Sequence, residues 1–325
     1  MTVPVLDVHL SGSDAADALR HDVRVGLSAD PKWLPPKWFY DARGSELFEE
    51  ITTLPEYYPT RTERELLRRN AGEIAVQAAA DTLVELGSGS SEKTRLLLDA
   101  LTVTGSLQRF VPLDVAESAL RDAMAAVAQE YPRLAVHGVV GDFTRHLELL
   151  PFDQTGRRLV AFLGGTIGNL LPPDRAGFLS ALHAVLEPGE LLLLGVGLAT
   201  DAAVLVPAYD DAAGVTAEFN RNVLHVLNRE LGADFNVAAF DHVAVWNAER
   251  EWIEMRLRAR RAMTVWLPAV DMTVHFAQGE EMLTEVSGKF RRDGLTAELA
   301  ECGFAERAWW VDPDDRFALV LAAAT

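Results

Sequence analysis

Between residues 82 and 198, apolar runs alternate with stretches of helical periodicity, and this alternation constrains the fold of the chain most strongly. The apolar runs lie at 82–87, 109–115, 134–143, 157–165 and 190–198. Helices are expected at 116–131 and 174–189. Strands that are apolar along their whole length are typical of parallel sheets covered by helices on both faces. The sequence therefore predicts an α/β fold, with strands near 305–312 and 317–324 as candidates for the last two of the sheet.

The first of these strands ends in a glycine turn, Gly87-Ser88-Gly89, and helical periodicity is expected from Glu92. Strand, glycine turn and helix form the first half of a nucleotide-binding unit. A dinucleotide-binding loop has a third glycine where this chain has Glu92, and a carboxylate there repels a diphosphate. The turn is therefore better suited to an adenosyl ligand without phosphate, and it predicts S-adenosylmethionine. A tight turn that binds no ligand is the alternative.

Polar residues follow the next three strands at their carboxyl ends, where open α/β sheets bind ligands. Asp114 closes the second strand, 25 residues after Gly89, and is placed to accept both ribose hydroxyls. The pair Asp142-Phe143 closes the third strand and is placed to bind adenine through the carboxylate and the next backbone N–H. Gly164 and Asn169, after the fourth strand, are expected beside the reacting methyl group. A single Asp at such a place also serves as a helix cap, but four positions in register favour a cofactor site.

Composition restricts the partners of the protein. The net charge of -18, with a pI of about 4.8, repels nucleic acid and anionic membranes, which favours a small-molecule substrate. Cys302 is the single cysteine and cannot form an internal disulfide, as expected in a reducing cytoplasm. No apolar run reaches the roughly 20 residues of a membrane span, and no signal-peptide core is present. The histidines lack metal-ligand spacing, so no metal is expected.

The pattern changes after residue 198. Residues 199–240 look helical, and 242–266 alternate apolar and polar residues as an antiparallel hairpin or meander does. We therefore expect 199–286 to be an insertion that packs with residues 1–62 as an α+β substrate-binding lobe. Residues 63–198 and 287–325 would form the cofactor-binding domain, and a cleft between the two lobes would hold the substrate.

At this point the chain resembles a known family, the histidine Nα-methyltransferases of ergothioneine biosynthesis. The resemblance covers nearly the whole chain, and its first and last stretches are more specific than the glycine loop. It rests on "LPPKWFYDARGSELFEEITTLPEYYPTRTE" (34–63), "ELGSGSSEKTR" (85–95), "FLGGTIGNL" (162–170), "AYDDAAGVTAEFNRNVL" (208–224) and "EMLTEVSGKF" (281–290). It implies a class I methyltransferase with a Rossmann-like sheet and an inserted substrate-binding lobe. The implied reaction moves three methyl groups from S-adenosylmethionine to the α-amine of L-histidine and gives hercynine.

The resemblance also implies roles for individual residues. The cofactor would be bound by Gly87, Lys93, Asp114, Asp142 and Phe143. The carboxylate and amino end of histidine, and of its mono- and dimethyl forms, would be held by Tyr57, Asn169 and Tyr209. The imidazole would be bound by Glu285 and Ser287, with Met255 packed on the ring and Thr216 reached through water. The reacting amine would lie beside Tyr40, Gly164 and Asn169.

Two other functions stay open, and one departure from the family pattern bears on them. The chain could be a methyltransferase of the same fold that acts on another amino acid or amine. It could also bind S-adenosylmethionine without catalysis. The departure is Val196-Gly197 after the fifth strand, where a Thr-Asp pair is expected in relatives. It puts the local wall of the substrate pocket in doubt. A monomer is expected.

Overall fold

The computed structural model describes residues 3–10, 12–151 and 156–325. These residues form two compact units. The first unit contains the residues up to Leu10, together with Pro59–Leu198 and Phe290–Thr325. The second contains the segment that ends at Tyr58, together with Ala199–Lys289. Each unit has hydrophobic core of its own.

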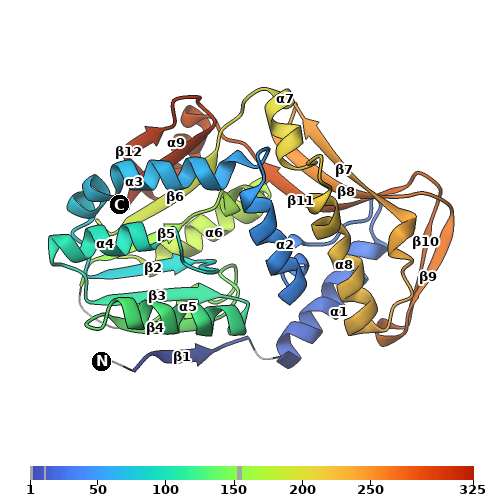
Figure 1. Ribbon diagram of the computed structural model, residues 1–325, viewed down its shortest axis with the longest axis horizontal. Coiled ribbons are helices and arrows are strands. Elements are labelled where there is room, and N and C mark those ends of the chain that lie inside the picture. Colours follow the sequence, from blue (N-terminus) through green and yellow to red (C-terminus); the bar gives the residue numbers. More distant parts are fainter. Residues whose placement is uncertain (1–2, 11, 152–155) are drawn as a thin grey trace. The chain divides into compact units, whose positions relative to one another are not determined.

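The first unit is built on one sheet with the strand order β1-β4-β3-β2-β5-β6-β13-β12 (Figure 1). Its strands are β1 (Val5–Val8), β2 (Thr82–Leu86), β3 (Arg109–Asp114), β4 (Ala135–Val140), β5 (Arg158–Phe162), β6 (Leu191–Gly197), β12 (Phe304–Val311) and β13 (Phe317–Ala324). Neighbours from β1 to β6 pair in parallel, whereas β13 pairs with β6, and β12 with β13, in the antiparallel direction. The predicted α/β sheet is therefore confirmed, and so are its two C-terminal strands.

Helices cover both faces of this sheet (Figure 1). One face packs against α3 (Tyr58–Ala78), α4 (Arg95–Thr104) and α5 (Glu117–Glu130), and the other against α6 (Pro172–Val185) and α9 (Arg292–Glu301). Short 3-10 turns are η2 (Leu147–Leu149) and η3 (Thr166–Asn169). Side chains of β5 alternate between the two cores: Leu159 and Ala161 face the first group of helices, and Val160 and Phe162 face the second. Burial on both faces explains why the strands are apolar throughout.

Three boundaries differ from those expected from the sequence. Residues 5–8 were assigned to the substrate lobe, but β1 pairs in parallel with β4 and extends the sheet of the first unit. The first crossover helix begins at Arg95 rather than at Glu92, because residues 92–94 form a turn. β4 ends at Val140, so Asp142 lies in the turn that follows the strand.

The second unit combines antiparallel strands with helices from two distant parts of the chain. Its strands are β7 (Phe240–Asn247), β8 (Trp252–Ala259), β9 (Met263–Leu267), β10 (Met272–Phe276) and β11 (Glu281–Gly288). Its helices and 3-10 turns are α1 (Gly12–Ser28), η1 (Pro36–Phe39), α2 (Ala42–Thr53), α7 (Ala202–Leu205), η4 (Val206–Ala208), α8 (Val215–Leu231), η5 (Val237–Ala239) and η6 (Pro268–Val270). The antiparallel pairing of β7 with β8 confirms the pattern read in the sequence.

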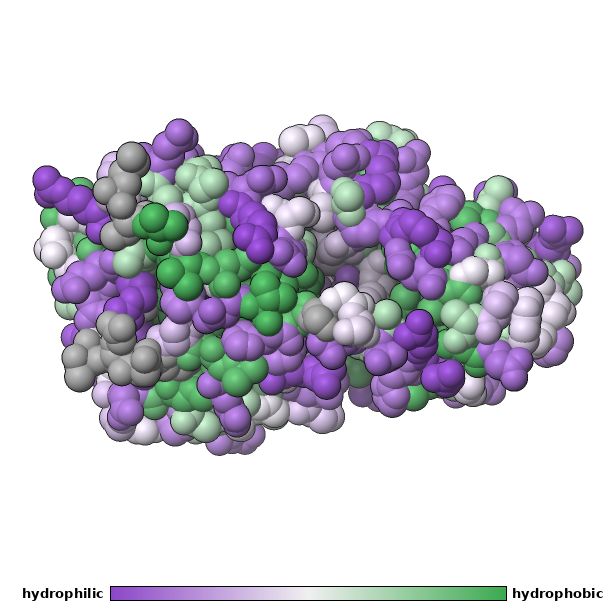
Figure 2. Space-filling model, turned by 90° about the horizontal axis from the view of Figure 1, so that it is seen from below, coloured by the Kyte–Doolittle hydropathy of each residue, from purple (hydrophilic) through white to green (hydrophobic). Residues whose placement is uncertain are grey.

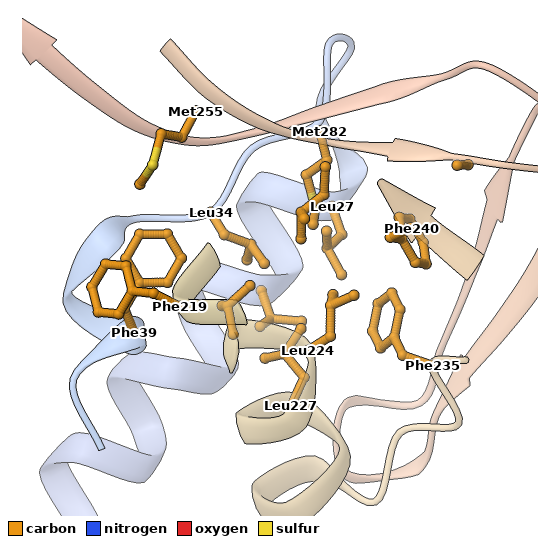
Figure 3. Close-up of a cluster of buried hydrophobic side chains, with 14 of the residues drawn as sticks. Leu27, Leu34, Phe39, Phe219, Leu224, Leu227, Phe235, Phe240, Met255 and Met282 are labelled. Carbon is orange, nitrogen blue, oxygen red and sulfur yellow. The ribbon is translucent and has the colours of Figure 1, made fainter. Parts of the chain in front are cut away.

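The core of the second unit brings the N-terminal helical segment, α8 and the strands together (Figure 3). Phe39 and Phe219 lie with their ring centroids 4.8 Å apart, and Met255 of β8 points into the same interior. A hydrogen bond adds to this packing, since the Asn222 side chain donates to the Phe39 carbonyl at 2.9 Å. The core fixes the strands that carry the candidate substrate residues.

The surface is polar with scattered apolar residues, as Figure 2 shows for one face. Val5 and Val8, on the edge strand β1, are about half exposed. Single exposed apolar residues of this kind are common in folded proteins. Among the described residues, no helix is both long and apolar enough to span a membrane.

Candidate functional site

The glycine turn after β2 has the backbone conformation that its glycines were expected to allow. Gly87 and Gly89 have left-handed φ values of 69° and 49°. The Gly87 N–H donates to the Leu113 carbonyl at 2.8 Å, and the Gly89 N–H donates to Asp114 Oδ2 at 2.8 Å. The Ser88 hydroxyl is buried and makes no hydrogen bond to a described residue. The turn is therefore fixed by the next strand.

Asp114 occupies the predicted place at the end of β3. Besides Gly89, the carboxylate accepts from the Ala116 N–H, which lies 2.9 Å from Oδ1. Burial raises the pKa of Asp114 above its usual value, against the opposing effect of these backbone donors. A carboxylate has about four lone-pair positions. Asp114 can therefore brace the glycine turn and still accept from two ribose hydroxyls.

The Asp142-Phe143 pair has a matching arrangement. Asp142 Oδ1 accepts from the Thr144 N–H at 2.8 Å and from its hydroxyl at 2.6 Å, which leaves Oδ2 for a ligand donor. The Phe143 ring packs edge-on against Phe162, with ring centroids 5.0 Å apart. The local turn thus orients the carboxylate, and the aromatic contacts hold the neighbouring backbone.

Sequence reasoning missed Glu63, a fully buried carboxylate of α3. Its Oε1 accepts from the Gly164 N–H at 2.7 Å, and its Oε2 pairs with Lys93. A Cβ at Gly195 of β6 would lie 1.8 Å from Glu63 Oε1, so a larger residue there would displace this carboxylate. Lys93, predicted to bind the cofactor, is thus held by Glu63. The backbone of Gly164, predicted to lie beside the amine, is held by the same carboxylate.

A second buried carboxylate lies beneath the glycine turn. Glu85 of β2 accepts from the Ser91 hydroxyl at 3.1 Å and from the Thr94 hydroxyl. Burial raises its pKa to about 7, although these hydroxyls and the charge of Lys93 act in the opposite direction. Glu85 therefore ties the strand to the start of α4. Among the remaining predicted residues of this unit, Asn169 ends η3 and is partly exposed.

In the second unit, three side chains form a closed hydrogen-bonded triangle. The Tyr209 hydroxyl lies 2.7 Å from Ser287 Oγ. Lys289 Nζ donates to both oxygens at 2.8 Å. All three residues are buried. Tyr209 and Ser287 were predicted from the resemblance, whereas Lys289 was not.

Glu285 lies on β11 with Ser287, and its carboxylate can accept a hydrogen bond from an imidazole N–H. It is only 8% exposed, and its carboxylate makes no hydrogen bond or ion pair within the described part of the chain. Burial raises its pKa to about 7, partly offset by the positive charge of Lys289. Met255 of β8 is its cross-strand partner, and Ser287 follows two residues later on the same face of β11. The two strands therefore bring Glu285, Ser287 and Met255 together.

The backbone carbonyl of Tyr209 is bound by a chain of hydrogen-bonded polar groups that was not predicted from the sequence. The Thr284 hydroxyl donates to Asn220 Oδ1 at 2.6 Å, and the Asn220 amide donates to His242 Nδ1 at 2.8 Å. His242 Nε2 lies 2.7 Å from the Tyr209 carbonyl, which can only accept, so Nε2 carries the proton. Burial lowers the pKa of His242, consistent with this neutral ring. The chain fixes the backbone of Tyr209.

The remaining predicted substrate residues lie in the same unit. The Tyr57 ring packs edge-on against Tyr209, with centroids 6.2 Å apart. The Tyr40 ring packs edge-on against Phe219, with centroids 5.3 Å apart. Thr216 is buried in the first turn of α8, and its N–H donates to Asp211 Oδ1 at 2.7 Å.

The suspected departure at Val196-Gly197 has a structural explanation. Both residues belong to β6, where they are buried and pair with β13. A Thr-Asp pair does occur shortly after the strand, at Thr200-Asp201. Asp201 caps α7 by accepting from the Ala203 N–H at 2.8 Å. Val196-Gly197 therefore belongs to the strand itself and not to the segment that follows it. In the part of the chain that the structure describes, no group of three potential metal ligands is found.

The chain is similar to known proteins over most of its length. The profile of a family described as "Histidine-specific methyltransferase, SAM-dependent" matches residues 19–324. A histidine N-alpha-methyltransferase from Mycolicibacterium smegmatis is 60% identical over 314 residues, or 97% of each chain. One of the same description from Mycobacterium tuberculosis is 58% identical over 313 residues, covering 96% of this chain and 97% of that one. Ergothioneine biosynthesis protein 1 of Neurospora crassa is 33% identical over 70% of this chain and 27% of its own length.

Proposed function

Since the chain belongs to the S-adenosylmethionine-dependent, histidine-specific methyltransferase family, we propose that it methylates the α-amino group of L-histidine. It transfers three methyl groups and gives hercynine, a step of ergothioneine biosynthesis. The near full-length similarity to histidine N-alpha-methyltransferases supports this substrate.

The observation that carries the proposal is the pairing of Glu285 with Ser287 on one face of β11. A neutral imidazole has one N–H donor and one nitrogen acceptor. The buried carboxylate of Glu285 can accept from the N–H, and a hydroxyl can serve the other nitrogen. Met255, opposite Glu285, supplies an apolar contact for the ring. A site of this kind rejects side chains that leave its buried polar groups unpaired.

The reaction is a displacement at carbon. The lone pair of the neutral amine forms a bond to the methyl carbon while the carbon–sulfur bond breaks, and the electron pair of that bond stays on sulfur. The cofactor leaves as S-adenosylhomocysteine. The enzyme has to hold the amine roughly 3 Å from the methyl group, in line with the departing sulfur. After each of the first two transfers the new ammonium group releases a proton, to water directly or through the Tyr40 hydroxyl, which passes its own proton on to solvent, before the amine can react again.

Each unit contributes one set of residues to this proposal. The first unit binds the cofactor through Gly87, Lys93, Asp114, Asp142 and Phe143, and it supplies Gly164 and Asn169 for the amino end of the substrate. The second unit binds the amino acid through Tyr57, Tyr209, Thr216, Met255, Glu285 and Ser287, with Tyr40 for the proton. We further propose that the protein acts on this small-molecule substrate as a monomer in the cytoplasm and, given its net charge of -18, does not bind nucleic acid.

A substrate panel tests the proposal. The purified protein is incubated with S-adenosylmethionine and with L-histidine, histamine, L-tryptophan or L-phenylalanine, and S-adenosylhomocysteine formation is followed. L-Histidine is expected to give the largest kcat/KM by at least about tenfold, because only it satisfies both the imidazole and the carboxylate contacts. A larger kcat/KM for another member of the panel would reassign the substrate.

A further inference from the structure

We infer that Lys289 is a specificity residue that selects α-amino acids over amines, by placing a positive charge where the substrate carboxylate binds. The inference rests on the proposed function and adds to it a residue that neither the sequence motifs nor the comparisons assign. It starts from the triangle of Tyr209, Ser287 and Lys289, all of which lie in the second unit.

The hydrogens of this triangle can be counted. Lys289 Nζ has three N–H groups and uses two of them, one to the Tyr209 oxygen and one to Ser287 Oγ, each at 2.8 Å. One of the two hydroxyls donates to the other across 2.7 Å. When the Tyr209 hydroxyl donates to Ser287, the unused hydroxyl hydrogen belongs to Ser287 and serves the imidazole nitrogen. One unused ammonium hydrogen of Lys289 remains, and a charged donor of this kind suits a carboxylate oxygen.

The charges lead to the same assignment. Lys289 is buried, and it forms no ion pair within the described part of the chain. Burial lowers the pKa of Lys289 to about 7, the charge of Glu285 opposes this effect, and the two groups do not pair directly. An uncompensated buried ammonium group is costly, and an anionic ligand removes that cost. L-Histidine supplies the anion as its α-carboxylate, and its imidazole N–H donates to the carboxylate of Glu285.

A fixed cation near the cofactor would repel its positive sulfonium. Two of the three N–H groups of Lys289 donate to hydroxyls, and the third is left for the ligand together with the positive charge. The substrate carboxylate neutralises it whenever the site is filled. Lys289 therefore contributes to ground-state recognition of the amino acid rather than to the chemical step.

The test compares L-histidine with histamine, which has the same imidazole and amine but no carboxylate. Dissociation constants of both are measured by calorimetry at saturating S-adenosylhomocysteine, for wild type and for Lys289→Met. We expect L-histidine to bind roughly 10- to 100-fold more weakly to the variant, as for loss of a hydrogen bond to a charged group. Histamine binding should change less than about threefold, so the preference for the amino acid falls.

Two further variants keep the result interpretable. Lys289→Gln removes the charge but keeps donors and polar volume, and should show the same fall in preference if Lys289→Met does not fold. Lys32→Met is the matched control: Lys32 also lies in the second unit and is partly buried, beside Glu280 and the Phe276 ring, and its loss should leave the preference unchanged.

Equal weakening of both ligands, or an unchanged preference in a variant that still binds S-adenosylhomocysteine, would overturn the inference. Failure of the proposed function looks different, since wild type itself would then not methylate L-histidine. A wild type that methylates L-histidine but binds histamine as tightly would contradict the role of Lys289 alone.

Discussion

The Gly164 N–H donates to Glu63 at 2.7 Å, and the other oxygen of the same carboxylate pairs with Lys93. One buried side chain thus fixes the loop after β5 and neutralises a cation at the start of α4. A Cβ at Gly195 would displace this carboxylate. The cofactor carries a positive sulfonium, so the charge of Glu63 matters as well as its hydrogen bonds.

We predict that Glu63→Gln lowers the binding affinity for S-adenosylmethionine more than that for S-adenosylhomocysteine. The amide oxygen of Gln can still accept from Gly164, but Lys93 loses its counter-charge and repels the sulfonium. The expected loss is about tenfold for S-adenosylmethionine, with little change for the uncharged thioether. Calorimetry with both ligands checks this. Glu92→Gln, which breaks the exposed pair with Arg64, is the control and should not separate the two ligands. Equal loss of both ligands in Glu63→Gln would show that Glu63 acts through structure alone.

Asp114→Ala should weaken S-adenosylmethionine binding by roughly 10- to 100-fold, because two ribose hydroxyls lose a charged acceptor. The same change frees the Gly89 and Ala116 N–H groups that Asp114 now holds. Asp114→Asn keeps one oxygen acceptor and should lose less. L-Histidine affinity at saturating S-adenosylhomocysteine should change little. Unchanged cofactor affinity in Asp114→Ala would show that β3 does not supply the ribose acceptor.

The raised pKa of Glu85 should make the free energy of unfolding depend on pH. Its pKa is raised from 4.5 in the unfolded chain to about 7 in the folded one, so the folded state binds more protons between these values. Its contribution to stability therefore falls as the pH rises from about 4.5 to about 7 and stays low above that. Glu85→Gln removes this dependence. Relative to wild type, the variant should gain up to about 3 kcal/mol in free energy of unfolding at pH of about 8, and nothing near pH 4.5. Urea titrations at both pH values measure the difference, and an equal difference at both would contradict the burial effect.

The rate should depend on pH through the amine and through Glu285. Only the neutral amine has a lone pair, and an α-amino group titrates near about 8, so kcat should rise from neutral into alkaline pH. Burial raises the pKa of Glu285 to about 7, so its carboxylate is lost as the pH falls through that value and KM for L-histidine should rise. In Glu285→Gln, the KM for L-histidine should no longer rise as the pH falls, while kcat should still increase toward alkaline pH. A flat kcat from about pH 6 to about pH 9 would indicate that methyl transfer is not rate-limiting, or that the amine is not the nucleophile.

Glu285→Ala should lower the affinity for L-histidine by roughly one to two orders of magnitude, because an imidazole donor is left unpaired in a closed site. S-Adenosylmethionine binding should persist. With Met255→Val added, the vacated space should admit a larger apolar ring, so discrimination against L-tryptophan and L-phenylalanine should fall. A competition assay of the three amino acids checks this. If Glu285→Ala methylates L-histidine as well as wild type does, the imidazole is not held there.

The sequence predicted those parts of the structure that follow from periodicity. Apolar strands alternating with helices identified the sheet, and Asp114 stood out because carboxyl ends of parallel strands gather at one edge. Glu63 could not be identified in this way. It lies in the charged stretch "TRTERELLRRN", where one buried glutamate has no pattern to separate it from exposed neighbours.

Tertiary contacts between distant residues also escaped prediction. Asn220, His242 and Tyr209 form their hydrogen-bonded chain only because α8 packs beside β7. Lys289 lies one residue beyond β11, and its meeting with Tyr209 spans 80 positions of the sequence. Neither arrangement has a spacing that a single sequence can reveal.

The measurement that tests the central claim most directly is the mass and fragmentation of the product formed from L-histidine with excess S-adenosylmethionine. The proposed function predicts successive masses heavier by one, two and three methyl groups, with every added methyl on the α-nitrogen and none on the imidazole. The trimethyl form should accumulate at the end of the reaction. Methylation of a ring nitrogen, or no methylated histidine from a protein that binds the cofactor, would contradict it.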